Sequence, residues 1–295
     1  MGGLTTLAKT ANSSASAQST GTLYVVATPI GNLADMVPRA VDVLQSVDLI
    51  ACEDTRYSAR LLEHFSIDTK TTAYHDYSDD RRVERLIERL QAGQNIALIS
   101  DAGTPLVSDP GYKLVREVRD AGLSMVPIPG ACAFVAALSV AGLPSDRFAF
   151  EGFLPSKRGA RQAVLSALAA DTRTLVFYEA PHRILASLQD IVEVMGPARE
   201  VVVAREISKT FETLLSGTAA ELVAIVAADS NQQRGEIVLL LHGADKKPVS
   251  ELDAEAERIM ALLADELPLK QASTLAAQIT GLKKKVLYQW ALEQK

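Results

Sequence analysis

The stretch NIALISDAGTPLVSDPGYKLVREVRDAG, at residues 95–122, decides the class of fold. It opens with a short apolar run at 95–100, which predicts a buried strand. It closes with apolar residues at helical spacing before a glycine, which predicts a helix at 112–122. A polar loop rich in glycine, proline and aspartate joins them at 100–111. A strand, a loop and a helix in this order are the unit from which parallel sheets are built.

The same alternation extends in both directions along the chain. Apolar runs predict further strands at 23–27, 48–52, 71–74 and 124–128, and helical spacing predicts helices at 38–47, 58–65, 81–93 and 132–142. Residues 141–148 break this rhythm. Beyond them the pattern predicts strands at 174–180, 200–206, 211–217 and 235–243, with helices at 183–196 and 221–228. Adjacent short strands make this half more antiparallel, so we predict two α/β domains.

Four segments are predicted from these shifts in pattern. They are a disordered tail at 1–20, an N-terminal α/β domain at 21–140, a second α/β domain at 141–245 and a helical segment at 246–295. The tail is rich in alanine, serine and threonine and lacks the apolar core of a signal peptide. Residues 268–295 have helix–turn–helix rhythm around Gly281, and they carry five lysines and one glutamate.

Composition excludes several classes of protein. With 295 residues, 48% hydrophobic and 22% charged, the chain is neither a disordered polymer nor a disulfide scaffold. A net charge of −6 argues against a wholly basic nucleic-acid coat protein, although it leaves room for a local basic surface. The two cysteines and four histidines have no metal-ligand spacing, and no apolar run reaches the ~20 residues of a membrane span. We therefore expect a cytoplasmic protein without a metal or a membrane partner.

Polar loops follow every strand that is predicted in the first domain. They lie at 28–36, 53–58, 75–80, 100–111 and 129–133. In a parallel sheet these loops meet at the carboxyl edge of the strands, which is where open α/β sheets bind ligands. The chain has neither a G-x-x-x-x-G-K-[ST] loop nor a G-x-G-x-x-G motif after its first strand. These loops therefore suit a small polar or cationic ligand better than a pyrophosphate.

Eight blocks of sequence carry a family resemblance. They are GTLYVVATPIGNLADM, VDLIACEDTR, ALISDAGTPLVSDPG, PIPGACA, AGLPSDRFAFEGFLPSKRGAR, TLVFYEAPHRI, VVVAREISKTFET and RGEIVLLL. In this order they resemble the ribosomal RNA small subunit methyltransferase I family, cytidine 2′-O-methyltransferases of the tetrapyrrole methylase fold. The resemblance runs from about Thr22 to the C-terminus. This chain departs from the family pattern at Ala27, at Tyr57–Ser58 and at Ala131.

The resemblance implies a fold, a reaction and partners. The fold is two α/β domains flanking a cleft, plus the small C-terminal helical segment. S-adenosylmethionine is the implied methyl donor, and 16S rRNA in the small ribosomal subunit is the implied substrate. A homodimer is implied as well. Two alternatives stay open, namely a tetrapyrrole methylase on the same fold and a non-catalytic RNA-binding assembly factor. The basic loop at 153–161 and the lysines of the C-terminal helical segment favour a polyanion, and the glycine-bearing loops favour a working cofactor site.

The strongest candidate cofactor loop is 100–111, where Gly103-Thr104-Pro105 resembles the Gly-Asp-Pro element of tetrapyrrole methylases. Its two aspartates either complement the positive sulfonium or cap turns. Gly130 lets the backbone approach a ligand, and Cys132 is expected to act as a small apolar group. The candidate cofactor-binding residues are Pro29, Gly31, Asp101, Gly103, Thr104, Pro105, Asp109, Gly130, Ala131, Cys132 and Tyr178.

Proton transfer and RNA binding need other side chains. Glu53, Asp54 and His75 are candidate general bases because they follow predicted strands, although bulk water and a plain helix cap are the alternatives. Cations near helix starts oppose the helix dipole, which favours an external phosphate over a merely solvated surface. The candidate RNA-binding residues are Arg56, Lys157, Arg158, Arg161, Lys283, Lys284 and Lys285.

Overall fold

The computed structural model describes residues 20–75, 80–245 and 254–294. Except for Thr20, the tail predicted at 1–20 lies outside the described residues. The described chain divides into two units. One contains residues 20–169 and 173–242, and the other contains residues 170–172 and 243–294. Both α/β halves therefore belong to a single unit, and the helical segment forms the second.

The first sheet is parallel throughout, as predicted, with the strand order β3-β2-β4-β1-β5. Its strands are β1 (Thr22–Val26), β2 (Leu49–Cys52), β3 (Thr71–Ala73), β4 (Ile96–Ile99) and β5 (Ser124–Ile128). All residues of β2 and β4 are buried, because helices cover both faces of the sheet. This burial explains why these strands read as continuous apolar runs in the sequence.

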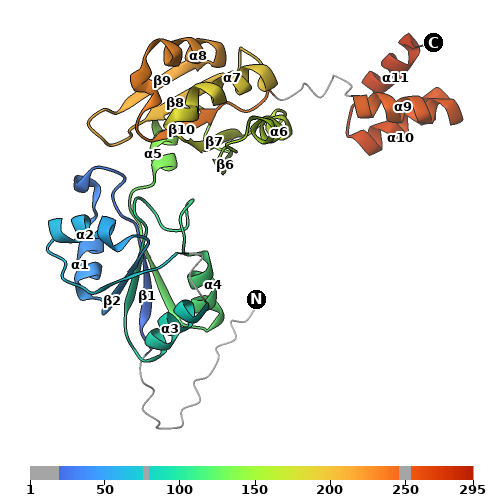
Figure 1. Cartoon of the computed structure of the whole chain (residues 1–295). Coiled ribbons are helices and arrows are strands. Elements are labelled where there is room, and N and C mark those ends of the chain that lie inside the picture. Colours follow the sequence, from blue (N-terminus) through green and yellow to red (C-terminus); the bar gives the residue numbers. More distant parts are fainter. Residues whose placement is uncertain (1–19, 76–79, 246–253, 295) are drawn as a thin grey trace, which may run out of the picture. The chain divides into compact units, whose positions relative to one another are not determined.

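Helices α1 (Pro38–Ser46) and α2 (Thr55–His64) pack on one face of this sheet, and α3 (Asp80–Gln91) and α4 (Tyr112–Asp120) on the other (Figure 1). Helix α2 begins three residues earlier than the sequence pattern predicts. The reason is a side-chain cap, since the carboxylate of Asp54 accepts a hydrogen bond of 2.8 Å from the backbone N–H of Arg56.

The second sheet is mixed, with the order β6-β7-β10-β8-β9. Strands β6 (Phe148–Phe153) and β7 (Thr174–Glu179) are parallel, whereas β8 (Glu200–Arg205), β9 (Thr213–Thr218) and β10 (Ile237–Leu241) pair antiparallel. The more antiparallel character is confirmed. Strand β6 was not predicted, because it begins in the stretch read as a break and is interrupted by a bulge at Gly152, whose φ is +69°.

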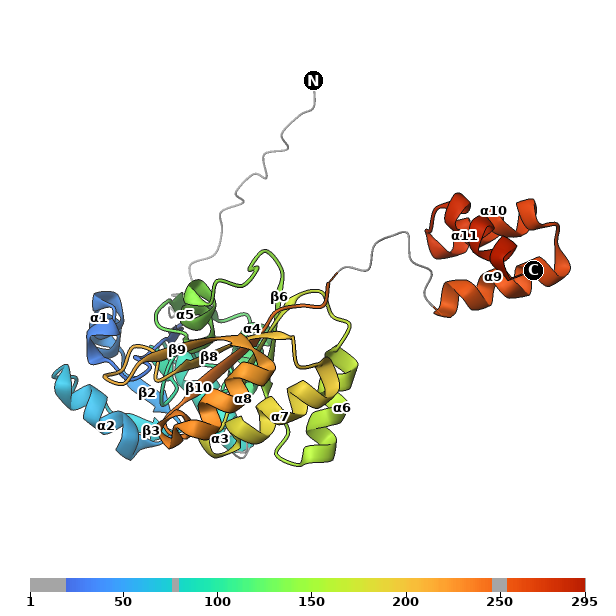
Figure 2. The same ribbon diagram turned by 90° about the horizontal axis from the view of Figure 1, so that it is seen from above.

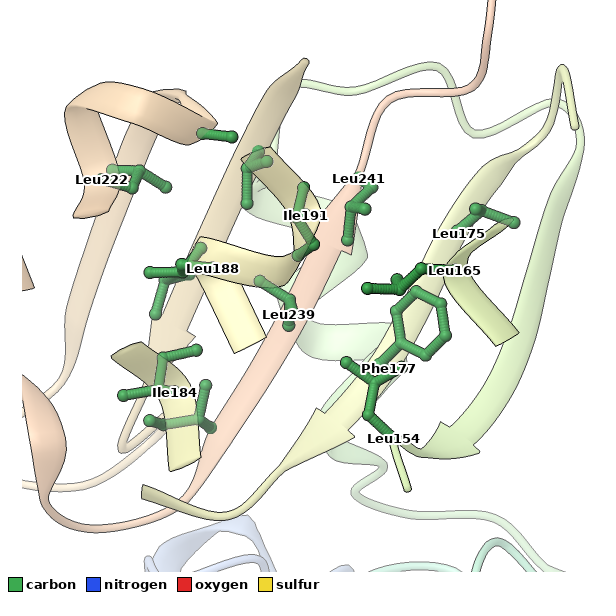
Figure 3. Close-up of a cluster of buried hydrophobic side chains, with 14 of the residues drawn as sticks. Leu154, Leu165, Leu175, Phe177, Ile184, Leu188, Ile191, Leu222, Leu239 and Leu241 are labelled. Atoms are coloured by element: carbon green, nitrogen blue, oxygen red, sulfur yellow. The ribbon is translucent and has the colours of Figure 1, made fainter. Parts of the chain in front are cut away.

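The core of the second sheet lies between its strands and helices α6 (Arg158–Leu168), α7 (Ile184–Met195) and α8 (Ala219–Ala228), which line up along one face in Figure 2. Figure 3 shows this core, in which Phe177, Leu239 and Leu241 of the sheet face the helical residues Leu165, Leu188 and Ile191. The opposite face packs against α5 (Ala133–Val140). Since α5 directly follows the first sheet in the chain, it joins the two halves into one unit.

The second unit consists of three helices around a small apolar core. They are α9 (Ala254–Glu266), α10 (Leu269–Thr280) and α11 (Lys284–Glu293), and they bury Met260, Ala276 and Leu287. Gly281 ends α10 in a left-handed conformation with φ +73°. The helix–turn–helix prediction with Gly281 at the turn is therefore confirmed, and so is the fold class of two α/β halves plus a helical segment.

Candidate functional site

A cavity of about 340 Å³ opens beside the loop that follows β4. Residues 102–104 and 107–109 of this loop form one wall, and Cys132 and Ala133 at the start of α5 continue it. The opposite wall comes from the second sheet, through Phe153, residues 178–181, Ala204 and residues 235–238. The cavity therefore lies between the two halves of the first unit, where the resemblance places a cleft.

Hydrogen bonds tie the loops after β1, β4 and β5 together beneath this cavity. Thr28 and Gly103 form a backbone bridge, with N–H donors 2.8 and 3.1 Å from the partner's carbonyl oxygen. The hydroxyl of Thr104 donates to the carbonyl oxygen of Ala131 at 3.0 Å. Gly103 has φ +82°, and a Cβ there would lie 3.3 Å from Ile30. The loop thus presents bare backbone to the cavity at a position that a larger residue would strain.

Five of the eleven predicted cofactor residues line this cavity, namely Gly103, Thr104, Asp109, Cys132 and Tyr178. Gly130 and Ala131 line an adjoining cavity of about 450 Å³, which shares Ile30, Cys132 and Ile207 with the first. A Cβ on Gly130 would lie 2.9 Å from the Cβ of Ala27, so glycine lets two loops approach closely. Pro29, Gly31, Asp101 and Pro105 line neither cavity.

Gly31 has a different neighbour from the one predicted. A Cβ at this residue would lie 2.4 Å from the side chain of Lys209, which reaches over from the second half. The Lys209 ammonium donates to Glu206 at 3.0 Å and to Glu236 at 2.9 Å. The hydroxyl of Ser208 donates to the carboxylate of Asp35 next to this contact. Gly31 therefore serves the contact between the two halves.

Among the described residues, three carboxylates line the main cavity, namely Asp109 from the loop after β4 and Glu179 and Glu236 from the second half. Burial, helped by the negative charges of Glu53 and Asp101, raises the pKa of Asp109 to about 6, although a hydrogen bond from Ser100 acts in the opposite direction. Burial also raises the pKa of Asp101 and that of Tyr178, so the Tyr178 phenol stays protonated at neutral pH. With a pKa of about 6, Asp109 can change charge close to neutral pH.

The three predicted general bases lie outside this cavity. Asp54 is a helix cap and forms an ion pair of 3.1 Å with Arg56, and these hydrogen bonds lower its pKa. Glu53 acts on Asp109 through its charge, and His75 is exposed in the loop after β3. Sequence reasoning placed Asp109 in the site and missed its suitability as a proton acceptor, because the burial of a loop residue leaves no signal in the sequence.

The prediction that Arg161 contacts RNA is wrong. Its side chain is only 5% exposed, and its guanidinium nitrogens lie 2.6 and 2.7 Å from Oδ2 of the buried Asp190. Arg158 lies 3.1 Å from Oδ1 of Asp190 and 2.5 Å from Glu193, although it stays 65% exposed. The helix-dipole argument for an external anion fails at both residues, because α7 supplies the anions. Lys157, just before α6, remains exposed.

The lysines of the helical unit meet the geometry that was predicted for them. Lys283 precedes α11, Lys284 and Lys285 form its first turn, and all three are exposed. In the described part of the chain none of the three forms an ion pair. Among the residues that the structure describes, no group of His, Cys, Asp and Glu could hold a metal ion, and no helix could cross a membrane.

Two family models match this chain. Residues 22–223 match the model of the tetrapyrrole (corrin/porphyrin) methylases, and residues 250–295 match that of the RsmI C-terminal HTH domain. The first match takes in the whole first sheet, most of the second and all the loops of the first half around the cavity. It defines the class to which the fold and the site belong, that of a methylase.

Curated relatives are similar over nearly the whole chain. Ribosomal RNA small subunit methyltransferase I of Escherichia coli O157:H7 is 55% identical over 94% of this chain and 96% of its own length. The protein of the same name from Pseudomonas aeruginosa is 56% identical, with 94% and 98% covered. The chain belongs to the tetrapyrrole methylase family and, within it, to the family of ribosomal RNA small subunit methyltransferase I. The resemblance seen in the sequence is confirmed.

Solved structures show the same fold at much lower identity. Uroporphyrin-III-C-methyltransferase from Thermus thermophilus is 19% identical with a TM-score of 0.53, over 75% of this chain and 94% of that one. A diphthine synthase is 15% identical with a TM-score of 0.57, over 75% and 89%. Their likeness to this chain is one of fold alone, so it does not support the tetrapyrrole alternative.

Proposed function

We propose that this chain transfers a methyl group from S-adenosylmethionine to the ribose 2′-hydroxyl of a cytidine in 16S rRNA of the small ribosomal subunit. The observation that carries the proposal is the cavity between the two halves, which combines a bare glycine backbone with a buried carboxylate in a chain related over its length to enzymes named for this RNA. The reaction would take place in the cytoplasm, where small subunits assemble.

The residues around the main cavity fit the proposed cofactor. Gly103 offers backbone where a Cβ would already lie 3.3 Å from Ile30, and Ala102, Ala133 and Ala180 keep the surrounding walls open. The carboxylate of Asp109 supplies negative charge close to where a cation would bind. S-adenosylmethionine supplies an activated methyl group on a positively charged sulfur when it is bound. Gly103, Thr104, Ala133 and Asp109 are the residues that would hold it.

The side chains of the chain then have two tasks. The walls of the cavity fix the direction in which the ribose hydroxyl approaches, which removes much of the entropic barrier. Asp109 can take up the proton that this hydroxyl releases, because a pKa of about 6 leaves its carboxylate mostly ionised yet still basic at neutral pH. We therefore assign the role of general base to Asp109 in place of Glu53, Asp54 and His75.

RNA would be bound by cations outside the cavity. We propose phosphate contacts for Lys157, Lys283, Lys284 and Lys285, which are exposed, and for Arg56, whose ion pair with Asp54 leaves most of its side chain in solvent. Arg158 can contribute in part, because it remains exposed while bonded to Asp190. A homodimer, which the resemblance implies, completes the proposal.

Methyl transfer to purified small subunits tests this function. Subunits from a strain that lacks the enzyme are incubated with the chain and S-adenosylmethionine labelled in its methyl group, and the RNA is then digested to nucleosides. We expect the label in 2′-O-methylcytidine. Subunits from the parent strain are the control, because their site is already methylated and should take up no label. Label in a base, or no transfer to the unmethylated subunits, would contradict the proposal.

A further inference from the structure

Three of the most exposed aromatic rings in the described chain belong to elements that border the main cavity and its loops. Tyr57 is 56% exposed, Tyr112 62% and Phe153 57%. Isolated exposed apolar side chains are common on protein surfaces and need no explanation. These three, however, come from separate elements that meet around one site.

Tyr57 and Tyr112 flank the carboxyl edge of the first sheet. Each lies in the first turn of a helix, α2 after β2 and α4 after β4, and these two strands are neighbours in the sheet. The helices pack on opposite faces, so the two rings lie on either side of the strand ends. The loops between them are joined, because the backbone N–H of Asp54 donates to Oδ1 of Asp101 at 3.2 Å.

Phe153 approaches the same place from the second sheet. It ends β6, lines the main cavity and lies with its ring centroid 5.5 Å from that of Tyr178. The preceding residue, Gly152, is close to the loop after β4, since a Cβ there would lie 3.8 Å from the hydroxyl oxygen of Ser108. The surroundings of the cavity therefore carry exposed rings from both halves of the unit.

Charge is arranged around these rings in two zones. Inside, the cavity wall carries Asp109, and the negative charges of Glu53 and Asp101, which do not line the cavity, lie close enough to act on it, so phosphate is disfavoured there. Outside, the side chain of Arg56, next to Tyr57, is 91% exposed, and Arg116 donates to the hydroxyl of Tyr112 at 3.1 Å. Phosphates would thus stay at the rim while neutral sugar and base groups approach the cavity. Aromatic rings interleaved with exposed cations are typical of surfaces that bind single-stranded nucleic acid.

We propose that Tyr57, Tyr112 and Phe153 form a stacking surface for unpaired RNA bases next to the acceptor nucleotide. This inference rests on the proposed function, and it adds that the RNA segment at the site must be single-stranded. Stacking is tolerant of sequence because every base has a π-face, so these rings would supply affinity without reading the sequence.

The test uses a single-stranded RNA decamer of mixed sequence that contains 2-aminopurine, together with the duplex of the same sequence. Binding is measured by fluorescence for Tyr57→Ala and Tyr112→Ala, with Tyr57→Trp and Tyr112→Phe as matched variants that keep a ring. We expect each alanine variant to bind the single strand at least about fivefold more weakly, with an unchanged salt dependence, and the ring-bearing variants to bind like the parent. Arg56→Gln should instead flatten the salt dependence.

Three outcomes would overturn the stacking surface. The first is an alanine variant that binds the single strand as tightly as the parent, and the second is an equal loss for the duplex. The third is a change in oligomeric state on sedimentation, which would place the rings between copies of the chain. Methyl transfer to small subunits by the parent is measured in parallel. If the parent methylates small subunits and the alanine variants bind the single strand normally, only the stacking surface is contradicted. If the parent is inactive and the alanine variants bind more weakly, only the proposed function is contradicted.

Discussion

Two loop regions stand out in the sequence for different reasons, the glycine- and proline-rich loop at 100–111 and the basic loop at 153–161. The loop at 100–111 lies at the cleft between the two halves, because six of its residues line the main cavity. The basic loop is available for RNA contact only in part, because Arg161 is buried in an ion pair with Asp190, and Arg158, although 65% exposed, is bonded to Asp190 as well. Only Lys157 of that stretch is left as an exposed cation without an internal partner among the described residues.

The difference shows which kind of residue in the sequence predicts its structural role more directly. Glycine is favoured where the backbone adopts a positive φ, as at Gly103 with φ +82°. This preference is local and does not depend on where the loop lies in the fold. A charged side chain in the sequence indicates only that it needs water or an opposite charge around it. That opposite charge can come from the same protein. Asp190 is 29 residues from Arg161 in the chain, so no local pattern pairs them.

The largest effect is expected at Arg161. Arg161→Ala removes the buried partner of the Asp190 carboxylate, which keeps only Arg158 and Gln162, and removing one member of a buried ion pair typically lowers stability by about 3–5 kcal/mol. Lys157→Ala is the matched control and should change the free energy of unfolding by less than about 0.5 kcal/mol. Urea denaturation checks both. If Arg161→Ala and Lys157→Ala were equally stable, the ion pair of Arg161 with Asp190 would not be buried as described.

The proposed role of loop 100–111 in cofactor binding can be tested at Gly103. Gly103→Val adds a branched side chain where a Cβ already lies 3.3 Å from Ile30, on a backbone with φ +82°. We expect a folded protein whose affinity for S-adenosylmethionine, measured by titration calorimetry, is lowered more than about tenfold, or by about 1.4 kcal/mol. Gly122→Val is the control, since Gly122 also has a positive φ, +67°, but open space around it. If both variants lost affinity for S-adenosylmethionine equally, backbone strain alone would explain the loss, and Gly103 would have no particular role in cofactor binding.

A pH profile sharpens the view of the same loop. Because burial raises the pKa of Asp109 to about 6, its side chain holds a proton in the folded state that it has lost in the unfolded chain between about pH 4 and 6. Stability therefore falls as pH rises through this window, and Asp109→Asn should remove that fall. The variant should also lose the rise of kcat/KM through about pH 6.

Asp54 gives the opposite sign and serves as the control for that profile. Hydrogen bonds from Arg56 lower its pKa, so its contribution to stability is present at neutral pH and is lost as pH falls below its ordinary value. Asp54→Asn should therefore lower the melting temperature slightly at pH 7 and not at low pH. A pH profile of stability for Asp109→Asn that parallels the parent's at every pH would show that folding does not raise the pKa of Asp109.

The helical unit offers a basic surface whose charges are not used internally. Lys283→Gln, Lys284→Gln and Lys285→Gln, combined in one variant, leave its apolar core intact, because that core is formed by other residues such as Met260 and Leu287. We expect an unchanged melting temperature and a several-fold higher KM for small subunits. If the triple variant methylates small subunits as well as the parent does at a limiting subunit concentration, these lysines do not contact RNA and form only a solvated surface.

Sequence predicted the first sheet and its loops because each strand, loop and helix there is a local unit with its own periodicity. It missed strand β6, where Gly152 inserts a bulge that shifts the pairing between Phe150 and Gly152. It also missed half of the cavity wall. Ala204, Ile207 and residues 235–238 come from strand ends of the second sheet and the loops beside them, and they reach the site only because α5 docks that sheet next to the first.

Steady-state methylation kinetics with both substrates varied test the central claim most directly, since it assigns the cofactor to loop 100–111 and RNA contact to Lys157. We predict that Gly103→Val raises the KM for S-adenosylmethionine by more than about tenfold and leaves the KM for small subunits unchanged. Lys157→Ala should do the reverse to a smaller extent, with a salt slope lower by up to about 0.7–0.9 for each phosphate that the variant no longer binds. Variants that both raise the same KM would contradict this division of the two regions.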